Sequence, residues 1–241
     1  MSERSPREVR PEVWVNCAAS ADGRIAFAEG ARARLSSAED LRRVQAMRAD
    51  VDGILVGVGT VLLDDPSLRV HWDLLGRAPG AEPTRIVVDG SGRTPEGARV
   101  LDGSIPTIVG VSERCHRRFP AHVRTIVAGS ARVDLGLLFV RLAELGVRRL
   151  LVEGGSEILA SVLGAGLFDR FTVYYAPVLI GDGTAPSIVA GRAARSFDDV
   201  RGLELRGIER SGEGYVATYV PRRAPGPAPP GPPDRTAPFE P

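Results

Sequence analysis

Apolar residues gather in short runs separated by polar, glycine-rich turns, and the most informative of these units covers residues 51–66. Its first part, VDGILVGV, is almost continuously apolar, as is typical of a strand buried on both faces. The run then passes through GVGT and ends on the carboxylates Asp64 and Asp65. Glycines at a strand end let the backbone approach a ligand closely. We therefore expect the floor of a ligand site here; the alternative is a glycine-rich turn with solvated acids.

Strand patterns alternate with helix patterns through the first two thirds of the chain. Strands are expected at residues 12–19, 51–58, 84–89, 107–111, 124–128 and 148–153, and helices at 36–49, 133–145 and 157–163. In the first helix, Ser36 as N-cap and Glu39 three residues later form a capping box. Its apolar residues Leu41, Val44 and Met47 should face the core. This alternation indicates an α/β fold with a largely parallel sheet.

The pattern changes after residue 167, where three further strands are expected at residues 171–175, 203–208 and 215–220. The last two flank the turn sequence SGEG and should form an antiparallel hairpin at one edge of a mixed sheet. Nine of the 21 residues from 221 to 241 are proline, so this tail cannot build a core and is expected to be disordered. Residues 1–10 are expected to form a disordered arm, which leaves one domain over residues 11–220.

Composition narrows the classes of partner. The 241 residues carry a net charge of +1, with 43% hydrophobic and 25% charged residues, as in an ordinary soluble globular protein. Nothing points to nucleic acid or an acidic membrane surface, and the charged N-terminus lacks the apolar core of a signal peptide. The two cysteines and three histidines are scattered without metal-ligand spacing. We expect a cytoplasmic protein without a metal site.

Three expected strand ends carry residues suited to binding: residues 57–64, 89–93 and 153–156. Parallel sheets bind ligands beyond the carboxyl ends of their strands, so all three ends can line one crevice. Gly154, Gly155 and Ser156 between a strand and a helix suit a pyrophosphate, because free N–H groups gather at a positive helix terminus. The alternative is a tight turn capped by the serine. The Rossmann fingerprint lacks its third glycine here, so a dinucleotide would bind by another arrangement.

Three charged residues at the ends of predicted elements each allow two interpretations. Arg48 ends its helix beside the central strand, where it either caps helix carbonyls or reaches a substrate phosphate. Glu153 is either a paired structural acid or a substrate ligand. Arg93 lies just beyond a strand, where it is either solvated or pairs with a 2′-phosphate. No nucleophile–base constellation is detectable by spacing, so hydrolysis is unsupported.

Four stretches, read in order, resemble one known family: NCAASADGRIA, RLSSAEDLRRVQAMRADVDGILVGVGTVLLDDPSL, TRIVVDGSGRTP and LLVEGGSEILASVLGAGLFDRFTVYYAPVLIGDG. They resemble the pyrimidine reductases of riboflavin biosynthesis, which include stand-alone archaeal and fungal enzymes and the C-terminal half of a bacterial bifunctional deaminase-reductase. TVLLDDPSL together with VEGG is the most specific part. The resemblance implies a dihydrofolate-reductase-like fold, NADPH as hydride donor and a homodimer. The implied reaction reduces the ribosylamino group of a pyrimidine 5′-phosphate to a ribitylamino group.

The resemblance also implies site residues. By motif, NADPH would contact Ala18, Thr60, Asp64, Gly154, Gly155 and Ser156, the last three at its pyrophosphate. The substrate would contact Arg48, Leu68, His71 and Glu153, with Arg48 holding its phosphate. Relatives often have serine directly after the VVD strand, whereas this chain has Gly90 and then Ser91. Either residue of this pair would meet the adenosine 2′-phosphate.

Alternatives remain open for the substrate. Arg34 and His71 match the archaeal pattern, and the chain lacks the H-x-E and P-C-x-x-C motifs of a zinc deaminase. These features favour the 2,5-diamino pyrimidine over its deaminated uracil form. A paralogous reductase with another substrate is less consistent with Arg48 and Glu153, since both would serve a ribose phosphate. The remaining alternative is a non-catalytic nucleotide-binding protein whose proline-rich tail docks a partner.

Overall fold

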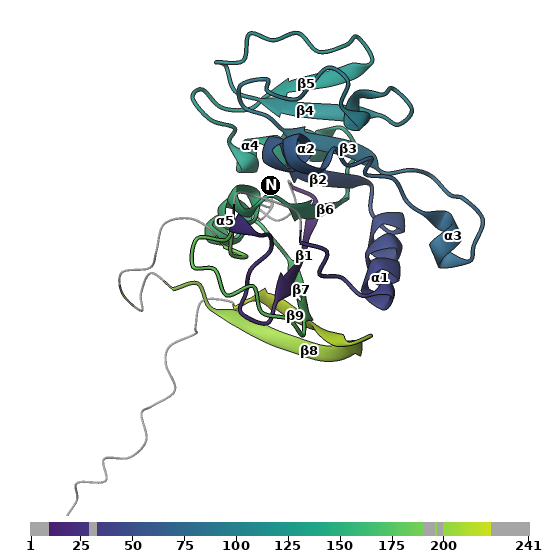
Figure 1. Cartoon of the computed structure of the whole chain (residues 1–241). Coiled ribbons are helices and arrows are strands. Elements are labelled where there is room, and N and C mark those ends of the chain that lie inside the picture. Colours follow the sequence, from purple (N-terminus) through teal and green to yellow (C-terminus); the bar gives the residue numbers. More distant parts are fainter. Residues whose placement is uncertain (1–9, 29–32, 190–195, 197–199, 223–241) are drawn as a thin grey trace, which may run out of the picture.

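The computed structural model describes residues 10–28, 33–189, 196 and 200–222. Nine strands form one sheet in the order β5-β4-β3-β2-β6-β1-β7-β9-β8 (Figure 1). The strands are β1 (Glu12–Ser20), β2 (Gly53–Gly57), β3 (Thr84–Val88), β4 (Thr107–Val111), β5 (Val123–Val127), β6 (Arg149–Gly154), β7 (Arg170–Ala176), β8 (Leu203–Ser211) and β9 (Gly214–Pro221). The helices are α1 (Ala38–Ala49), α2 (Val58–Asp64), α3 (Trp72–Leu75), α4 (Leu135–Glu144) and α5 (Ser156–Ala165), with the 3-10 turn η3 (Arg99–Leu101).

The pairing is parallel from β5 across to β7 and antiparallel for β7–β9 and β8–β9. The expected mixed sheet with an antiparallel C-terminal hairpin is therefore confirmed. The expected arm and tail lie almost wholly outside the described residues. At the tail's start, Pro221 still belongs to β9, and the Arg222 N–H donates to the Gly202 carbonyl.

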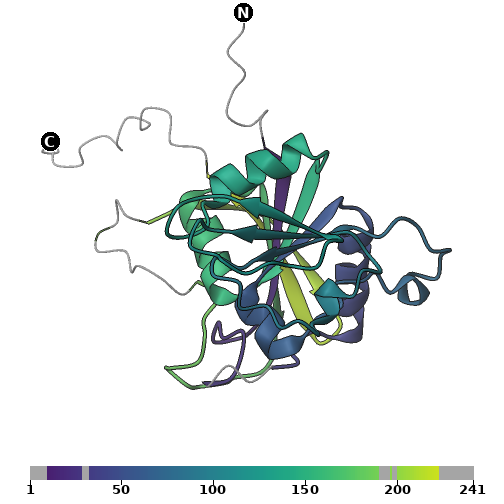
Figure 2. The same ribbon diagram turned by 90° about the horizontal axis from the view of Figure 1, so that it is seen from above.

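Helices cover both faces of the sheet. Seen from above, the green α4 and α5 lie to one side and the blue α1 and α2 to the other (Figure 2). Alternate residues of β1 divide accordingly: Val13, Val15 and Cys17 join the core under α4 and α5, while Ala18 packs with Tyr174 on the opposite face. A second core, which includes Val58 and Val61 of α2, covers β2, β3 and β4 on the α1 side. The site described below lies on that side.

Helix α1 departs from its expected form. Its N-cap is Ser37 rather than Ser36, and the Ser37 side chain accepts a hydrogen bond from the Asp40 N–H. The expected apolar face is confirmed at Met47, which packs against the second core, but not at Leu41, which is 46% exposed; the buried residues of the helix are Asp40 and Gln45. The reason is what the helix packs against: polar groups of β1 and of residues 68–72, which polar side chains must satisfy.

Two further local structures differ from expectation. The apolar run after β2 does not continue as a strand or loop, because helix α2 begins directly at Val58 with Gly57 as N-cap. Residues 71–83, where the sequence predicts neither helix nor strand, contain the single turn of α3. Each segment is too short for a helical period to stand out in the sequence.

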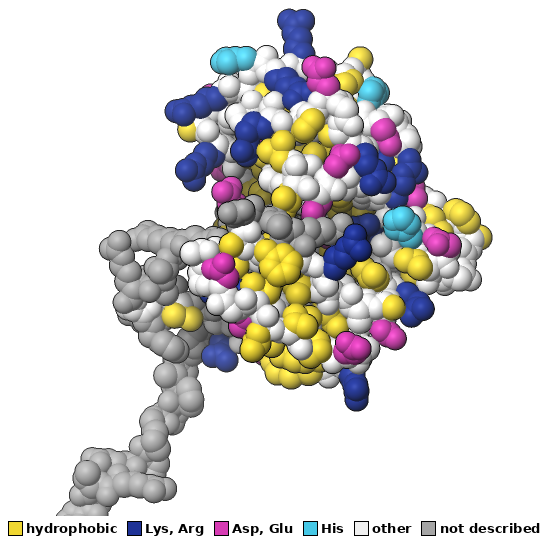
Figure 3. Space-filling model, viewed as in Figure 1, with side chains coloured by type: hydrophobic (Ala, Val, Ile, Leu, Met, Phe, Trp, Pro, Cys, Tyr) yellow, Lys and Arg dark blue, Asp and Glu magenta, His cyan; other side chains and the backbone are white. Residues whose placement is uncertain are grey.

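The outer strand β8 is the most exposed element of the sheet. Leu205 is 50% and Ile208 60% exposed, and the neighbouring Tyr215 of β9 is 43% exposed. Hydrophobic side chains gather at the lower end of the molecule, where this hairpin lies (Figure 3). The opposite edge strand, β5, is shorter, with five residues against the nine of β8.

Candidate active site

The three strand ends expected to line one crevice do meet in the structure. β3, β2 and β6 are parallel neighbours, so their carboxyl ends lie at the same edge of the sheet. β1 pairs with β6 on the other side, which brings the half-buried Ala18, near the end of β1, to this edge as well. After β2 the chain continues through β3 to β5, toward one side of the sheet, whereas the later strand β6 is inserted between β2 and β1. This reversal of direction makes the edge a topological switch point.

The turn from β6 into α5 is built from two glycines in the positive-φ region. Gly154 has φ 150° and Gly155 φ 85°, and Gly155 is the N-cap of α5 without a side-chain cap. The alternative of a serine-capped turn is thereby excluded, because Ser156 is the first helical residue. A Cβ built on Gly155 would lie 3.3 Å from the Thr60 Oγ1. The turn therefore presents backbone N–H groups at a helix N-terminus close to the Thr60 hydroxyl.

Helix α2 places the other two expected cofactor residues together. Thr60 and Asp64 are four residues apart on one helix, hence on the same face, and both are half-buried. The helix ends at Asp65, which has φ 38° and accepts a hydrogen bond from the Arg99 N–H at 2.8 Å. Of the two acids in DDP, Asp64 thus belongs to the face of Thr60 while Asp65 serves a structural contact.

The loop after β3 is held by hydrogen bonds to the buried side chain of Asp89. This carboxylate is fully buried and accepts hydrogen bonds from the N–H groups of Gly92, Arg93 and Thr94, at 2.7–3.0 Å, and from the Thr94 hydroxyl at 2.7 Å. The Ser112 hydroxyl donates to the Gly90 carbonyl at 2.7 Å. Ser91 and Arg93 are exposed on the resulting loop. Gly90 and Ser91 thus lie at the same edge as the glycine turn, one strand removed from α2.

Arg48 and Glu153 form a bidentate ion pair. The Arg48 Nε donates to Glu153 Oε1 at 2.8 Å and the Nη2 to Oε2 at 2.6 Å, with the side chains 16% and 9% exposed. Burial by itself lowers the pKa of Arg48, but the charge and hydrogen bonds of Glu153, with a contribution from Glu82, leave that pKa raised. Arg48 is therefore not a helix cap, and Glu153 is a paired acid at the edge of the site.

Glu153 owes its direction to a bulge in the sheet. In the β2–β6 ladder Leu55 pairs with Val152 and Val56 with Gly154, so Glu153 is the unpaired extra residue. Bulges re-aim side chains near active sites. The same register shift precedes the positive φ of Gly154. One irregularity thus prepares both the carboxylate and the glycine turn.

The expected substrate residues Leu68 and His71 lie on the segment between α2 and α3. Leu68 is 2% exposed with φ 49°, an unusual conformation for a residue with a side chain. His71 is exposed, and its N–H donates to Gln45 Oε1 at 2.9 Å. The Arg48 Nη1 donates to the Arg69 carbonyl at 2.9 Å. The structure therefore brings Arg48, Glu153 and this segment together.

Sequence reasoning missed Gln45 and Glu82, which bind the same segment. The sole signal for Gln45 was its position three residues before Arg48 on one helix. Glu82 lies outside every predicted helix and strand, and no signal in the sequence pointed to it. Within the described residues, no group of three or more His, Cys, Asp or Glu side chains is placed to hold a metal ion. Cys17 and Cys115 are free thiols, and burial raises the pKa of Cys17 to about 12.

A family model described as the RibD C-terminal domain matches residues 11–217. The chain belongs to this family. A 2,5-diamino-6-ribosylamino-4(3H)-pyrimidinone 5′-phosphate reductase of Methanothermobacter thermautotrophicus is 42% identical over 216 residues, which cover 88% of this chain and 99% of the relative. The enzyme of the same name from Archaeoglobus fulgidus is 39% identical, with 87% and 98% covered. The riboflavin biosynthesis protein RibD of Bacillus amyloliquefaciens is 34% identical, and the match covers 58% of its length.

Solved structures agree on the fold of this RibD C-terminal domain. The deaminase/reductase of Thermotoga maritima superposes with a TM-score of 0.74 at 24% identity, over 90% of this chain and 58% of that one. The riboflavin biosynthesis reductase Rib7 of Saccharomyces cerevisiae gives a TM-score of 0.70 at 21% identity, over 92% and 93%. The fold is that of these relatives, a mixed sheet flanked by helices with the expected antiparallel C-terminal hairpin. As a member of this family, the protein is a reductase of riboflavin biosynthesis. None of its described helices has the length and apolarity to cross a membrane.

Proposed function

We propose that the protein reduces 2,5-diamino-6-ribosylamino-4(3H)-pyrimidinone 5′-phosphate to its ribitylamino form, with NADPH as the hydride donor. The observation that carries this proposal is the arrangement at one sheet edge. The N-terminus of α5, which has no side-chain cap, lies beside Thr60 there. Strand β6, which leads into this helix, also carries Glu153 of the Arg48–Glu153 pair. This edge offers an anion cradle for a dinucleotide beside a second, charged subsite for a substrate.

The residues at the glycine turn fit NADPH. A side chain at Gly155 would press against Thr60 and carry φ 85°, so the turn keeps open the space that a pyrophosphate would fill. In the proposal, the N–H groups of Gly154, Gly155 and Ser156 hold the pyrophosphate. NADPH, when bound, supplies the hydride that ends on ribose C1′ of the substrate.

The remaining cofactor contacts follow from the neighbouring strands. Thr60 and Asp64 present one polar face of α2 to the same edge. In the proposal, Gly90 or Ser91, on the loop that Asp89 fixes, would meet the adenosine 2′-phosphate. In the proposal, Ala18, which is half-buried near the end of β1, would lie against the cofactor.

Arg48 keeps donors available for a phosphate. A guanidinium has five N–H groups, of which the structure engages three: two with Glu153 and one with the Arg69 carbonyl. In the proposal, the other two meet the substrate phosphate, with His71 exposed beside them, while Leu68 and Glu153 border the ribose and the pyrimidine. A dianion at a preorganised guanidinium forms the strong, charge-assisted type of hydrogen bond.

The diamino substrate is preferred over the deaminated one on a specific ground. Two archaeal relatives named for the diamino reaction match at 42% and 39% identity over 99% and 98% of their length. The bacterial RibD relative matches at 34% over 58% of its length. The second candidate is the same reduction of 5-amino-6-(5-phosphoribosylamino)uracil, a name carried by the T. maritima protein, whose 24% identity supports the fold alone.

The test is NADPH oxidation at 340 nm with the diamino and the uracil ribosylamino 5′-phosphates supplied separately. We expect faster turnover of the diamino compound, and slower turnover when NADH replaces NADPH. Faster turnover of the uracil compound would establish the second candidate instead. Saturable NADPH binding without turnover of either compound would reject the proposal in favour of a paralogous reductase or a non-catalytic nucleotide-binding protein.

A further inference from the structure

Residues 65–71, between α2 and α3, have no regular secondary structure, yet they carry two of the residues assigned to the substrate. Leu68 is held at φ 49° and His71 stands at the surface. A left-handed leucine is unfavourable in isolation, so neighbouring contacts must maintain it.

Helix α1 makes two hydrogen bonds to the backbone that follows Leu68, both from one face of the helix. The buried Gln45, 6% exposed, accepts the His71 N–H through Oε1 at 2.9 Å. One turn later, Arg48 donates from Nη1 to the Arg69 carbonyl at 2.9 Å while its other side binds Glu153. The substrate segment is therefore tied to the same helix that carries Arg48.

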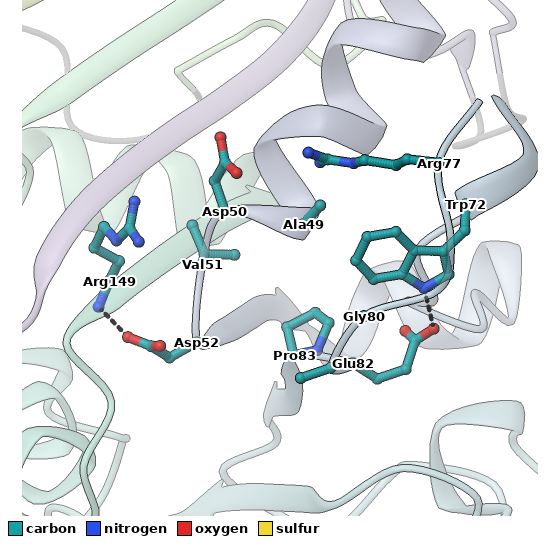
Figure 4. Close-up of a pocket in the computed structure, with 11 residues that line it drawn as sticks. Ala49, Asp50, Val51, Asp52, Trp72, Arg77, Gly80, Glu82, Pro83 and Arg149 are labelled. Atoms are coloured by element: carbon teal, nitrogen blue, oxygen red, sulfur yellow. Dashed lines mark hydrogen bonds between the residues drawn. The ribbon is translucent and has the colours of Figure 1, made fainter. Parts of the chain in front are cut away.

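Glu82, which precedes β3, accepts two more hydrogen bonds, from residues 70 and 72. Its Oε2 accepts the Val70 N–H at 3.0 Å and its Oε1 accepts the Trp72 Nε1–H at 3.1 Å. Figure 4 shows the second of these bonds, with the Glu82 carboxylate turned toward the indole at the wall of a pocket. The charge of Glu82 also acts on Arg48, since it contributes to the raised pKa of that residue. The Arg69 carbonyl and the N–H groups of Val70 and His71 are thus all hydrogen-bonded to side chains from outside the segment.

We infer that Gln45 and Glu82 are positioning residues that hold Leu68 and His71 in register with the Arg48–Glu153 pair, and thereby set the affinity for the phosphorylated substrate without touching the cofactor. This inference rests on the proposed function. Both residues act through the backbone N–H groups of residues 70 and 71. Small errors in the placement of binding groups carry large kinetic penalties, which makes such a brace consequential.

Gln45→Leu tests the first contact with little change in volume. The variant removes the acceptor of the His71 N–H, and we expect KM for the pyrimidine phosphate to rise about tenfold while KM for NADPH stays within about twofold. Arg42→Ala, an exposed change on the same helix, is the matched control and should alter neither constant. An equal rise of both constants in Gln45→Leu would indicate general damage and overturn the inference.

Glu82→Gln tests the second contact and has a built-in rescue. Glutamine offers one carbonyl oxygen where two N–H donors, from Val70 and Trp72, each need an acceptor, so its NH₂ group must face a donor. We expect a several-fold rise in KM for the substrate. Adding Trp72→Phe removes the indole donor, lets the amide oxygen serve Val70, and should return KM close to that of Trp72→Phe alone. A failure of this rescue would contradict a role through the Val70 N–H.

Amide hydrogen exchange gives a readout independent of turnover. In Gln45→Leu the His71 amide should exchange at least about tenfold faster, and in Glu82→Gln the Val70 amide should do the same, while Leu55 in β2 stays unchanged. Unchanged exchange at both amides would overturn the brace even if the protein is an active reductase. If the unaltered protein neither binds nor reduces the pyrimidine phosphates, the proposed function fails, and the link to substrate affinity fails with it.

Discussion

At the scale of single residues, the chemistry of the site depends on groups whose types the sequence shows but whose directions it does not. Arg48 and Glu153 were both recognisable as candidates, since each stands at the end of an element. Their pairing was not, because it depends on the bulge that leaves Glu153 without a partner in the β2–β6 ladder. Such a bulge is decided by how two strands meet, which no local pattern encodes.

Replacing Arg48 should separate substrate binding from cofactor binding. In Arg48→Ala we expect KM for the pyrimidine phosphate to rise by about two orders of magnitude, because charge-assisted hydrogen bonds are lost. The dissociation constant for NADPH, measured by fluorescence titration, should change by less than about twofold. Glu153 is left 9% exposed without its partner, so we also expect a loss of roughly 3 kcal/mol in the free energy of unfolding.

Two further variants serve as comparisons for Arg48→Ala. Arg141→Ala removes an arginine from an exposed pair with Glu144, 54% and 55% exposed, and should change stability by less than about 1 kcal/mol and leave kinetics intact. Arg48→Lys keeps the charge without the bidentate geometry and should fall between Arg48→Ala and the unaltered protein. Parallel losses of substrate and NADPH affinity in Arg48→Ala would remove Arg48 from the substrate subsite.

At the scale of elements, strands were easier to anticipate than the faces of helices. The nine strands lie within a few residues of the predicted ones, because most are short runs rich in β-branched or aromatic residues and bounded by turn residues. The predicted face of helix α1 holds at Met47 but not at the exposed Leu41, because the helix also covers polar surfaces, to which Gln45 and Arg48 bond. Amphipathic patterns identify the buried side only where the neighbouring surface is apolar.

The contact between β3 and the η3 segment predicts a dependence of stability on pH. Arg85 of β3 is fully buried and donates to Asp102 at 2.7 Å, and this bond, with the Ser104 hydroxyl, lowers the pKa of Asp102 below its ordinary value. A carboxyl with a lowered pKa in the folded state adds stability above its unfolded pKa of about 3.9 and loses that contribution as the pH falls through its folded pKa.

We therefore expect Asp102→Asn to be less stable than the unaltered protein at pH 7, and the difference to shrink at pH 3. Urea unfolding at both pH values measures it. Glu144→Gln, in the exposed pair on α4, is the control and should show little difference at either pH. A gap for Asp102→Asn that is equal at pH 7 and pH 3 would show that Arg85 does not hold that carboxyl in its charged form.

For the molecule as a whole, the class of the fold is predictable from the sequence, but the order of its strands is not. Alternating elements followed by a hairpin indicate a mixed sheet with an antiparallel edge, and the structure has one. The insertion of β6 between β2 and β1 creates the switch point at which the candidate site lies. That placement depends on long-range packing of α4 and α5 against the core under β1, which acts only once the chain is folded.

We predict that two copies of the protein associate through β8, the strand at the antiparallel edge of the sheet. This strand leaves nine residues at the rim of the sheet, with Leu205 and Ile208 half or more exposed, and unpaired edges with apolar side chains favour association. We propose a homodimer, as the family resemblance implies, and expect Ile208→Lys to lower the molar mass measured by light scattering to that of one chain. Leu145→Lys, an equally drastic change at an exposed leucine of α4's C-terminus, should leave the mass unchanged. A dimer that survives Ile208→Lys, or a single-chain mass for the unaltered protein at micromolar concentration, would contradict association through this edge.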